Sequence, residues 1–155
     1  MRRLLRLRPL AAALVAAALW SWPVAAPHPI VRGFVAPATP YAAGHRGIDV
    51  RAPEGAEVRA PAGGVVRFAG WVVDRPVLSI DHGGGVVSSY EPVATTLQAG
   101  DRVRRGDVIG TVLAGHCASP CLHLGVRVDG AYLSPLLFLG GQPRAVLLPL
   151  GPDGR

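Results

Sequence analysis

The segment APAGGVV at residues 60–66 decides how this chain folds, because a turn rich in Pro and Gly runs directly into β-branched residues. The same arrangement repeats along the chain, where short apolar runs alternate with turns that contain Gly, Pro or Asp. The runs lie at residues 48–50, 58–60, 65–71, 77–80, 86–90, 108–112 and 122–128. Runs this short between turns this dense predict a single all-β domain with a mostly antiparallel β-sheet core, rather than alternating strands and helices.

The flanks of this domain differ from it in composition. Residues 27–40 are rich in proline and lack periodicity, which predicts an extended lead-in. The domain itself is expected over residues 41–139, and a short C-terminal helical turn, capped by Ser134 with Pro135 as its first residue, is expected near its end. Residues 140–155 are rich in Gly and Pro and predict a flexible tail. A chain of 155 residues with 50% apolar composition has room for one such core.

Residues 1–26 have the layout of a secretory signal peptide. Four arginines within the first eight residues precede an apolar, alanine-rich run over about residues 9–22. This run is shorter than the roughly 20 residues of a spanning helix, so a secreted or cell-envelope location is expected. Cleavage after Ala26 would have to occur beside Pro27, whose ring restricts the backbone, so an uncleaved membrane anchor stays an alternative.

The charge pattern argues against a nucleic-acid partner. The whole chain has a formal charge of +6, but four of its arginines belong to the predicted signal peptide. From residue 27 onward, twelve arginines stand against ten acidic residues, with no basic run. The chain contains no lysine, which excludes chemistry that needs an amine nucleophile or a lysine attachment point.

Two histidines and an aspartate have the character of metal ligands. His45 and Asp49 are four residues apart on an extended segment and therefore point the same way, and Gly47 between them lets another backbone come close. His123 can complete the set from a neighbouring strand. Two imidazoles and one carboxylate suit a catalytic zinc whose fourth position stays open to water. The alternative is a hydrogen-bonded loop pair and a half-buried strand histidine.

The chain resembles the lysostaphin-type, or LytM-type, zinc metallopeptidases, which cut peptide cross-links in bacterial peptidoglycan. The resemblance covers about residues 41–139. It rests on the spacing His45-x-x-x-Asp49, on Pro53, on residues 60–66, 80–85 and 100–110, and on the pair Leu122-His123. It implies an all-β fold, zinc held by His45, Asp49 and His123, and a peptide of the cell wall as substrate.

Two positions depart from the family pattern. The family's His-x-His motif begins with a catalytic histidine, where this chain has Cys121, and a second catalytic histidine of the family is replaced by Pro92. His116 and His82 remain as candidate catalytic residues, each with a simpler alternative: an exposed loop histidine for His116 and a structural strand-end histidine for His82. Tyr90 and Glu91, just before Pro92, offer groups that orient water or stabilise an oxyanion.

The two cysteines, Cys117 and Cys121, are four residues apart with Pro120 between them. In an exported chain such a pair predicts a disulfide, which would fix the turn that leads to His123. The alternative is that Cys121 is a fourth metal ligand on the same strand face as His123. A fourth protein ligand would close the site and make the zinc structural.

Features of the sequence therefore suggest three functions. The first is a secreted zinc metallo-endopeptidase, and the second is a catalytically weakened domain of the same fold that binds wall peptide or regulates another cell-wall hydrolase. The third is a biotinyl or lipoyl carrier, because residues 60–66 and 100–109 also resemble carrier strands. Carriers attach their cofactor to a lysine, and this chain has none.

Overall fold

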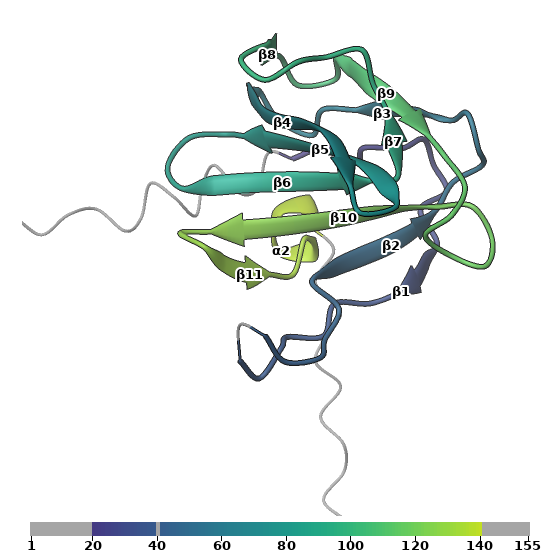
Figure 1. Ribbon diagram of the computed structural model, residues 1–155, viewed down its shortest axis with the longest axis vertical. Coiled ribbons are helices and arrows are strands. Elements are labelled where there is room, and N and C mark those ends of the chain that lie inside the picture. The colour runs from purple at the N-terminus through teal and green to yellow at the C-terminus, as the bar shows by residue number, and fades with distance from the viewer. Residues whose placement is uncertain (1–19, 40, 141–155) are drawn as a thin grey trace, which may run out of the picture.

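The computed structural model describes residues 20–39 and 41–140 of the chain, and Figure 1 shows their arrangement. The strands are β1 (Ile30–Arg32), β2 (Gly47–Arg51), β3 (Glu57–Arg59), β4 (Gly64–Val72), β5 (Arg75–Asp81), β6 (Val86–Glu91), β7 (Val93–Ala94), β8 (Arg102–Val103), β9 (Val108–Val112), β10 (Cys121–Val128) and β11 (Ala131–Leu133). One helical turn, α2 (Leu136–Leu139), follows them. Each of the seven predicted apolar runs overlaps one of these strands.

The strands form two sheets in which every pairing is antiparallel. The larger sheet has the order β1-β2-β10-β6-β5-β4-β8, with β11 added beside β10, and the smaller sheet has the order β3-β9-β7. The prediction of a mostly antiparallel all-β domain is therefore confirmed. No helix within residues 20–39 and 41–140 is both long and apolar enough to cross a membrane.

The core joins apolar side chains from both sheets. Its largest fully buried members are Tyr90, Ile48, Leu78, Ile80, Ile109, Leu122, Leu124, Val50, Val58, Val66, Val93 and Val112. Strand β10 lies between β2 and β6, and its residues 121–126 are all buried. Burial of consecutive residues means that both faces of this strand are covered, so β10 is a rigid support for any side chain that it carries.

The predicted helical turn is present, but it is not capped as the sequence suggests. No side chain caps α2, whose N-cap is Pro135. Instead, the backbone N–H of Leu137 donates to the carbonyl of Ser134 at 3.1 Å. Phe138 and Leu139 are buried, so the turn is held by packing against the core and not by a hydroxyl cap.

A short segment before the domain, residues 20–24, packs against it. The indole of Trp20 is 9% exposed and lies 4.8 Å from the ring of Phe138. Backbone hydrogen bonds hold the segment to β3 and the turn after it, since Ser21 donates to the carbonyl of Pro61 and Arg59 donates to that of Pro23. These residues fall within the part predicted as a signal peptide, whose first 19 residues lie outside the described part. Cleavage after Ala26 would remove Trp20 from the core.

The predicted extended lead-in, residues 27–40, contributes an edge strand to the larger sheet. Within it, β1 pairs with β2, with Ile30 opposite Val50. A single bridge between Val35 and His45 follows, so the lead-in also holds the backbone of His45 in place. The predicted tail lies outside the described residues beyond Gly140.

We expect Trp20→Ala to lower the free energy of unfolding by about 3–5 kcal/mol, because it removes a large buried ring from a packed core. Urea denaturation of the purified chain measures the change. Trp71→Ala is the matched control, since Trp71 is 71% exposed and its loss is expected to cost no more than about 0.5 kcal/mol. Equal losses in the two variants would contradict the packing of residues 20–24 on the domain.

Candidate metal centre

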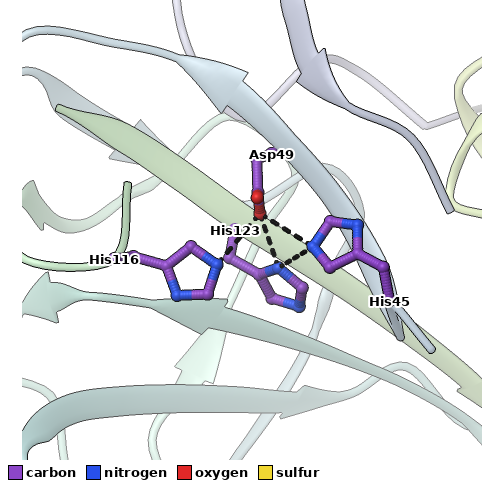
Figure 2. A group of neighbouring side chains, drawn as sticks. All are labelled: His45, Asp49, His116 and His123. Carbon is purple, nitrogen blue, oxygen red and sulfur yellow. Dashed lines mark hydrogen bonds and ion pairs between the residues drawn. The ribbon is translucent and has the colours of Figure 1, made fainter. Parts of the chain in front are cut away.

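The candidate site is built on the pairing of β2 with β10. In this antiparallel pair His123 lies directly opposite Asp49, and Gly125 lies opposite Gly47. His45 precedes β2 and is fixed by its bridge to Val35. Figure 2 shows the three predicted ligands pointing toward one another, together with the ring of His116. The structure therefore brings His45, Asp49 and His123 together, as the sequence predicts.

The donor atoms of these side chains converge on Oδ1 of Asp49. Nδ1 of His123 lies 2.7 Å from it, and Nε2 of His45 lies 3.1 Å from it. The two imidazole nitrogens are themselves 3.2 Å apart. Nε2 of His116 completes the group at 3.1 Å from the same oxygen. All four donor atoms lie within 4.8 Å of one another.

These separations fit one zinc ion. Two ligands of a tetrahedral zinc, each about 2.0–2.1 Å from the metal, lie roughly 3.3 Å apart. The observed distances between the donor atoms of His45, Asp49 and His123, from 2.7 to 3.2 Å, are close to that value. Imidazole and carboxylate donors also suit zinc better than calcium or magnesium, which prefer oxygen alone.

The surroundings favour the ligand forms of His45 and Asp49, whereas His123 donates its Nδ1–H to Asp49 and would carry that proton on Nε2 when Nδ1 binds a metal. Nδ1 of His45 donates to the carbonyl of Gly33 at 2.7 Å, which leaves the lone pair of Nε2 directed at the cluster. Burial would raise the pKa of the Asp49 carboxyl, but hydrogen bonds from His116 and His123 hold that pKa well below its usual range. Asp49 is therefore a carboxylate at neutral pH, although it is only 2% exposed.

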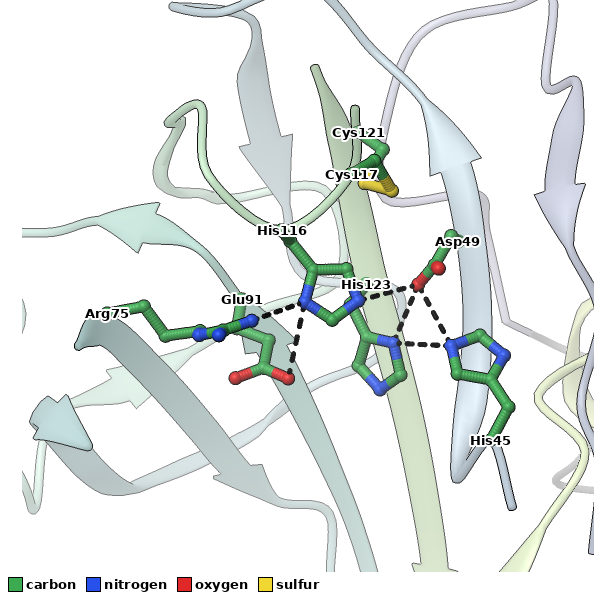
Figure 3. The surroundings of a disulfide bond; sticks show 8 residues. All are labelled: His45, Asp49, Arg75, Glu91, His116, Cys117, Cys121 and His123. Atoms are coloured by element: carbon green, nitrogen blue, oxygen red, sulfur yellow. Dashed lines mark hydrogen bonds and ion pairs between the residues drawn. A yellow bond between two sulfur atoms is a disulfide. The ribbon is translucent and has the colours of Figure 1, made fainter. Parts of the chain in front are cut away.

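Figure 3 shows that His116 reaches the cluster from the loop before β10. Its Nδ1 lies 2.8 Å from a terminal nitrogen of Arg75 and 3.9 Å from an oxygen of Glu91. A guanidinium can only donate, so Nδ1 of His116 accepts this hydrogen bond and the ring proton lies on Nε2, the nitrogen that faces Asp49. His116 is thus an N–H donor at the edge of the cluster, and its side chain is 13% exposed.

The loop that carries His116 is closed by the predicted disulfide between Cys117 and Cys121, whose Cα atoms are 5.9 Å apart. Both sulfurs lie near the carboxylate of Asp49. A disulfide sulfur has no thiolate to offer, so the bond removes Cys121 from the ligand set. The disulfide instead fixes the residue before it, His116, next to β10.

The other candidate, His82, does not join the cluster. Its Nδ1 bonds the carbonyl of Gly63 at 2.9 Å and its Nε2 bonds the hydroxyl of Ser88 at 2.7 Å. Its ring also lies 4.7 Å from that of Trp20. Burial lowers the pKa of His82, so the ring is neutral at neutral pH. Both nitrogens are occupied, and this arrangement matches the structural alternative.

Arg75 is a site residue that the sequence does not reveal. It begins β5 beside the hairpin turn and is held by two hydrogen bonds to the carboxylate of Asp74, at 2.8 and 3.1 Å. Nothing in the pair Asp74-Arg75 distinguishes it from an ordinary turn sequence. Its contact with His116 spans 41 residues and depends on the closed loop, so only the folded chain brings the two together.

An antiparallel β domain in which imidazoles surround one buried carboxylate has the character of a peptidase-like protein. The chain belongs to peptidase family M23, whose family model matches residues 43–135. This match confirms the resemblance to LytM-type peptidases, which the sequence placed at about residues 41–139.

Sequence identity to an individual protein is also high. The chain is 40% identical over 141 residues to the uncharacterized protein Rv2891 of Mycobacterium tuberculosis, a match that covers 86% of this chain and 56% of that protein. The chain thus spans little more than half the length of the curated relatives it matches.

Solved structures show the same fold. A zinc containing peptidase from Vibrio cholerae superposes with a TM-score of 0.66 at 25% identity, covering 76% of this chain and 39% of that one. The catalytic domain of lysostaphin from Staphylococcus simulans superposes with a TM-score of 0.62 at 21% identity, covering 73% and 92%.

Gly47 provides a test of the site geometry. A Cβ added there would overlap the carbonyl oxygen of Leu124 and lie 2.7 Å from Nε2 of His123. We expect Gly47→Ala to displace the His123 ring and to weaken zinc binding roughly tenfold or more, as measured by competition with a chelating dye. Gly63→Ala is the control, because its nearest atom would be 3.5 Å away. Unchanged zinc affinity in Gly47→Ala would contradict this geometry.

Proposed function

We propose that this chain is a zinc metallo-endopeptidase that hydrolyses peptide cross-links of bacterial peptidoglycan, outside the cytoplasm or in the cell envelope. The observation that carries the proposal is the convergence of His45, Asp49 and His123 at distances that suit one zinc ion. Membership of the M23 family supports it. The location rests on the signal-like residues 1–26, and recovery of the chain in the cytoplasmic fraction alone would contradict it.

Three residues would hold the metal. Nε2 of His45, Nδ1 of His123 and a carboxylate oxygen of Asp49 are the donors, and all three sit on or beside paired strands. Zinc bound there would supply Lewis-acid polarisation of a peptide carbonyl and would make a water molecule more acidic. Because the three side chains are buried, the site limits competing water and strengthens their electrostatic effect.

His116 serves beside the metal as a hydrogen-bond donor. Its Nδ1 accepts a hydrogen bond from Arg75, so the proton of the neutral ring stays on Nε2 and that nitrogen is not a ligand. His123 differs, because in the described part of the chain no guanidinium occupies its Nε2 and its proton can move there when Nδ1 binds the metal. The fourth zinc position therefore stays open, as a catalytic site requires. The N–H of His116 is directed into the cluster, where it stabilises negative charge that develops on a substrate carbonyl oxygen.

Glu91 supplies a second carboxylate beside the cluster, with its Oε1 3.9 Å from Nδ1 of His116. It lies opposite His123 on β6 and just before Pro92, the position where the family has a catalytic histidine. Its side chain is 25% exposed, so it can reach solvent and accept a proton at Oε1. Glu91 and His116 together replace the acid–base functions that Cys121 and Pro92 lack.

The second candidate function is a zinc-binding domain without peptidase activity that binds wall peptide or regulates another cell-wall hydrolase. One observation favours it: Pro92 has no titratable group, and the sulfur of Cys121 is bonded to Cys117, so neither family position offers a base. Loss of a positioned acid or base typically costs about 10²–10⁴-fold in rate.

Zinc content and cleavage of purified peptidoglycan separate the two functions. We expect one zinc per chain, and we expect His45→Ala, Asp49→Ala and His123→Ala each to lose it, because two ligands hold the ion poorly. His116→Ala should keep the zinc and lose at least about 10²-fold in cleavage rate. His82→Ala, corrected for folded protein, is the control that should leave the rate unchanged.

The outcomes are distinct. Zinc retained in the His45 or His123 variant would contradict the ligand assignment. Zinc bound by the native chain without release of peptide fragments would favour the second function. Loss of zinc in His116→Ala would make His116 a fourth ligand and the zinc site closed.

A further inference from the structure

A groove lies next to the candidate site over strands β4, β5, β6, β10 and β11. It has a volume of about 480 Å³, and both His123 and Glu91 line it. Three arginines, Arg46, Arg67 and Arg127, also line it. Glu91 is the single acidic residue among its lining residues, all of which belong to the described part of the chain. We call this the arginine groove.

Two of the arginines are held by one aromatic ring. The guanidinium carbon of Arg46 lies 5.6 Å from the centre of the Tyr132 ring, and that of Arg127 lies 5.7 Å from it. Arg127 also lies directly opposite Tyr132 in the antiparallel pairing of β10 with β11. Arg46 also donates to the carbonyl of Ala42 at 3.0 Å, whereas the contact of Arg127 with the ring holds its guanidinium by the face and leaves its N–H edge available for a planar anion.

The third arginine reaches the groove because β4 is irregular. The register of β4 against β5 passes from Val66 opposite Ile80 to Phe68 opposite Ser79, so Arg67 is the extra residue of a bulge. A bulge redirects the side chains around it. As a result Arg67 and Phe68, although adjacent in sequence, both line the groove and both are exposed.

Two arginines of the groove, Arg67 and Arg127, differ from some other arginines of the chain in their lack of a carboxylate partner among the described residues. Arg59 and Arg75 each form an ion pair with an acidic residue, Glu57 and Asp74 respectively. Over residues 20–39 and 41–140, by contrast, no carboxylate forms an ion pair with Arg67 or Arg127. Guanidinium groups without a carboxylate partner beside a binding groove favour a ligand that brings the carboxylate itself.

The floor of the groove links these arginines to the metal cluster. Residues 123, 125 and 127 lie on one face of β10, and Gly125 adds no side chain of its own between His123 and Arg127. Four residues of a strand span about 13 Å, which equals roughly four residues of an extended peptide. A peptide lying along β10 with its cleaved bond at the cluster would therefore place its third or fourth residue beside Arg127.

We propose that the arginine groove selects peptides that carry a free carboxylate three or four residues from the bond at the metal cluster. Arg67 and Arg127 bind that carboxylate, and Tyr132 positions the guanidinium of Arg127. The inference rests on the proposed function for the identity of the bond, but the binding preference itself needs no cleavage.

The test measures binding in the presence of EDTA, so that no peptide is cut. Three acetylated, alanine-rich hexapeptides serve as probes: one with a central glutamine and an amidated C-terminus, one with glutamate in place of that glutamine, and one with glutamine and a free C-terminus. Dissociation constants come from nuclear magnetic resonance titrations of the whole chain. We expect at least one acidic peptide to bind about fivefold or more tightly than the neutral one at low salt.

Comparison of the two acidic peptides distinguishes a side-chain carboxylate from a terminal one. The preference should shrink as salt is added, because the groove is open to solvent. It should also disappear in the double variant with Arg67→Gln and Arg127→Gln. A second double variant, with Arg104→Gln and Arg105→Gln, removes the same charge from exposed positions outside the groove and should keep the preference.

Equal affinities for acidic and neutral peptides, including no detectable binding of either, would overturn the proposal. So would a preference that survives in the double variant with Arg67→Gln and Arg127→Gln. Failure of the proposed peptidase function would appear differently, as zinc-loaded protein that leaves peptidoglycan intact, and it would not alter the binding preference in EDTA.

Discussion

The register between β2 and β10 is the constraint on which the rest of this structure depends. It sets His123 opposite Asp49 and Gly125 opposite Gly47. A shift by one residue would turn His123 to the other face of the sheet and would place a side chain where only glycine fits. The same register buries Ile48, Val50, Leu122 and Leu124, so the core and the candidate metal site are stabilised by one pairing.

The fold could be predicted from the sequence because its signals are local. Each of the seven apolar runs is a signal confined to a few consecutive residues, and each run overlaps a strand. The division into two sheets and the bulge at Arg67 could not be predicted, because they depend on which strands pair. The packing of Trp20 could not be predicted for a similar reason, because an apolar run with the layout of a leader gives no sign that one of its residues packs on the core.

The residues of the candidate site also differ in whether local sequence signals predict their positions. His45 and Asp49 are four residues apart on an extended segment, so their proximity follows from spacing, and the family resemblance supports the choice of His123 as the third ligand. The place of His116 was undecided in the sequence, since it depends on how the loop closed by Cys117 and Cys121 folds back. The contact of Arg75 with that ring joins residues far apart in the chain, and no periodicity signals it.

The close approach of His123 to Gly47 has an energetic consequence. The imidazole lies against backbone on one side and against Asp49 on another, so its rotamer freedom is lost when the sheet forms. A metal ion bound there would not have to order this side chain, because the ordering penalty is already included in the cost of folding. Metal binding of that kind would differ from that of small metal-dependent folds, in which ligand ordering and metal binding are one event.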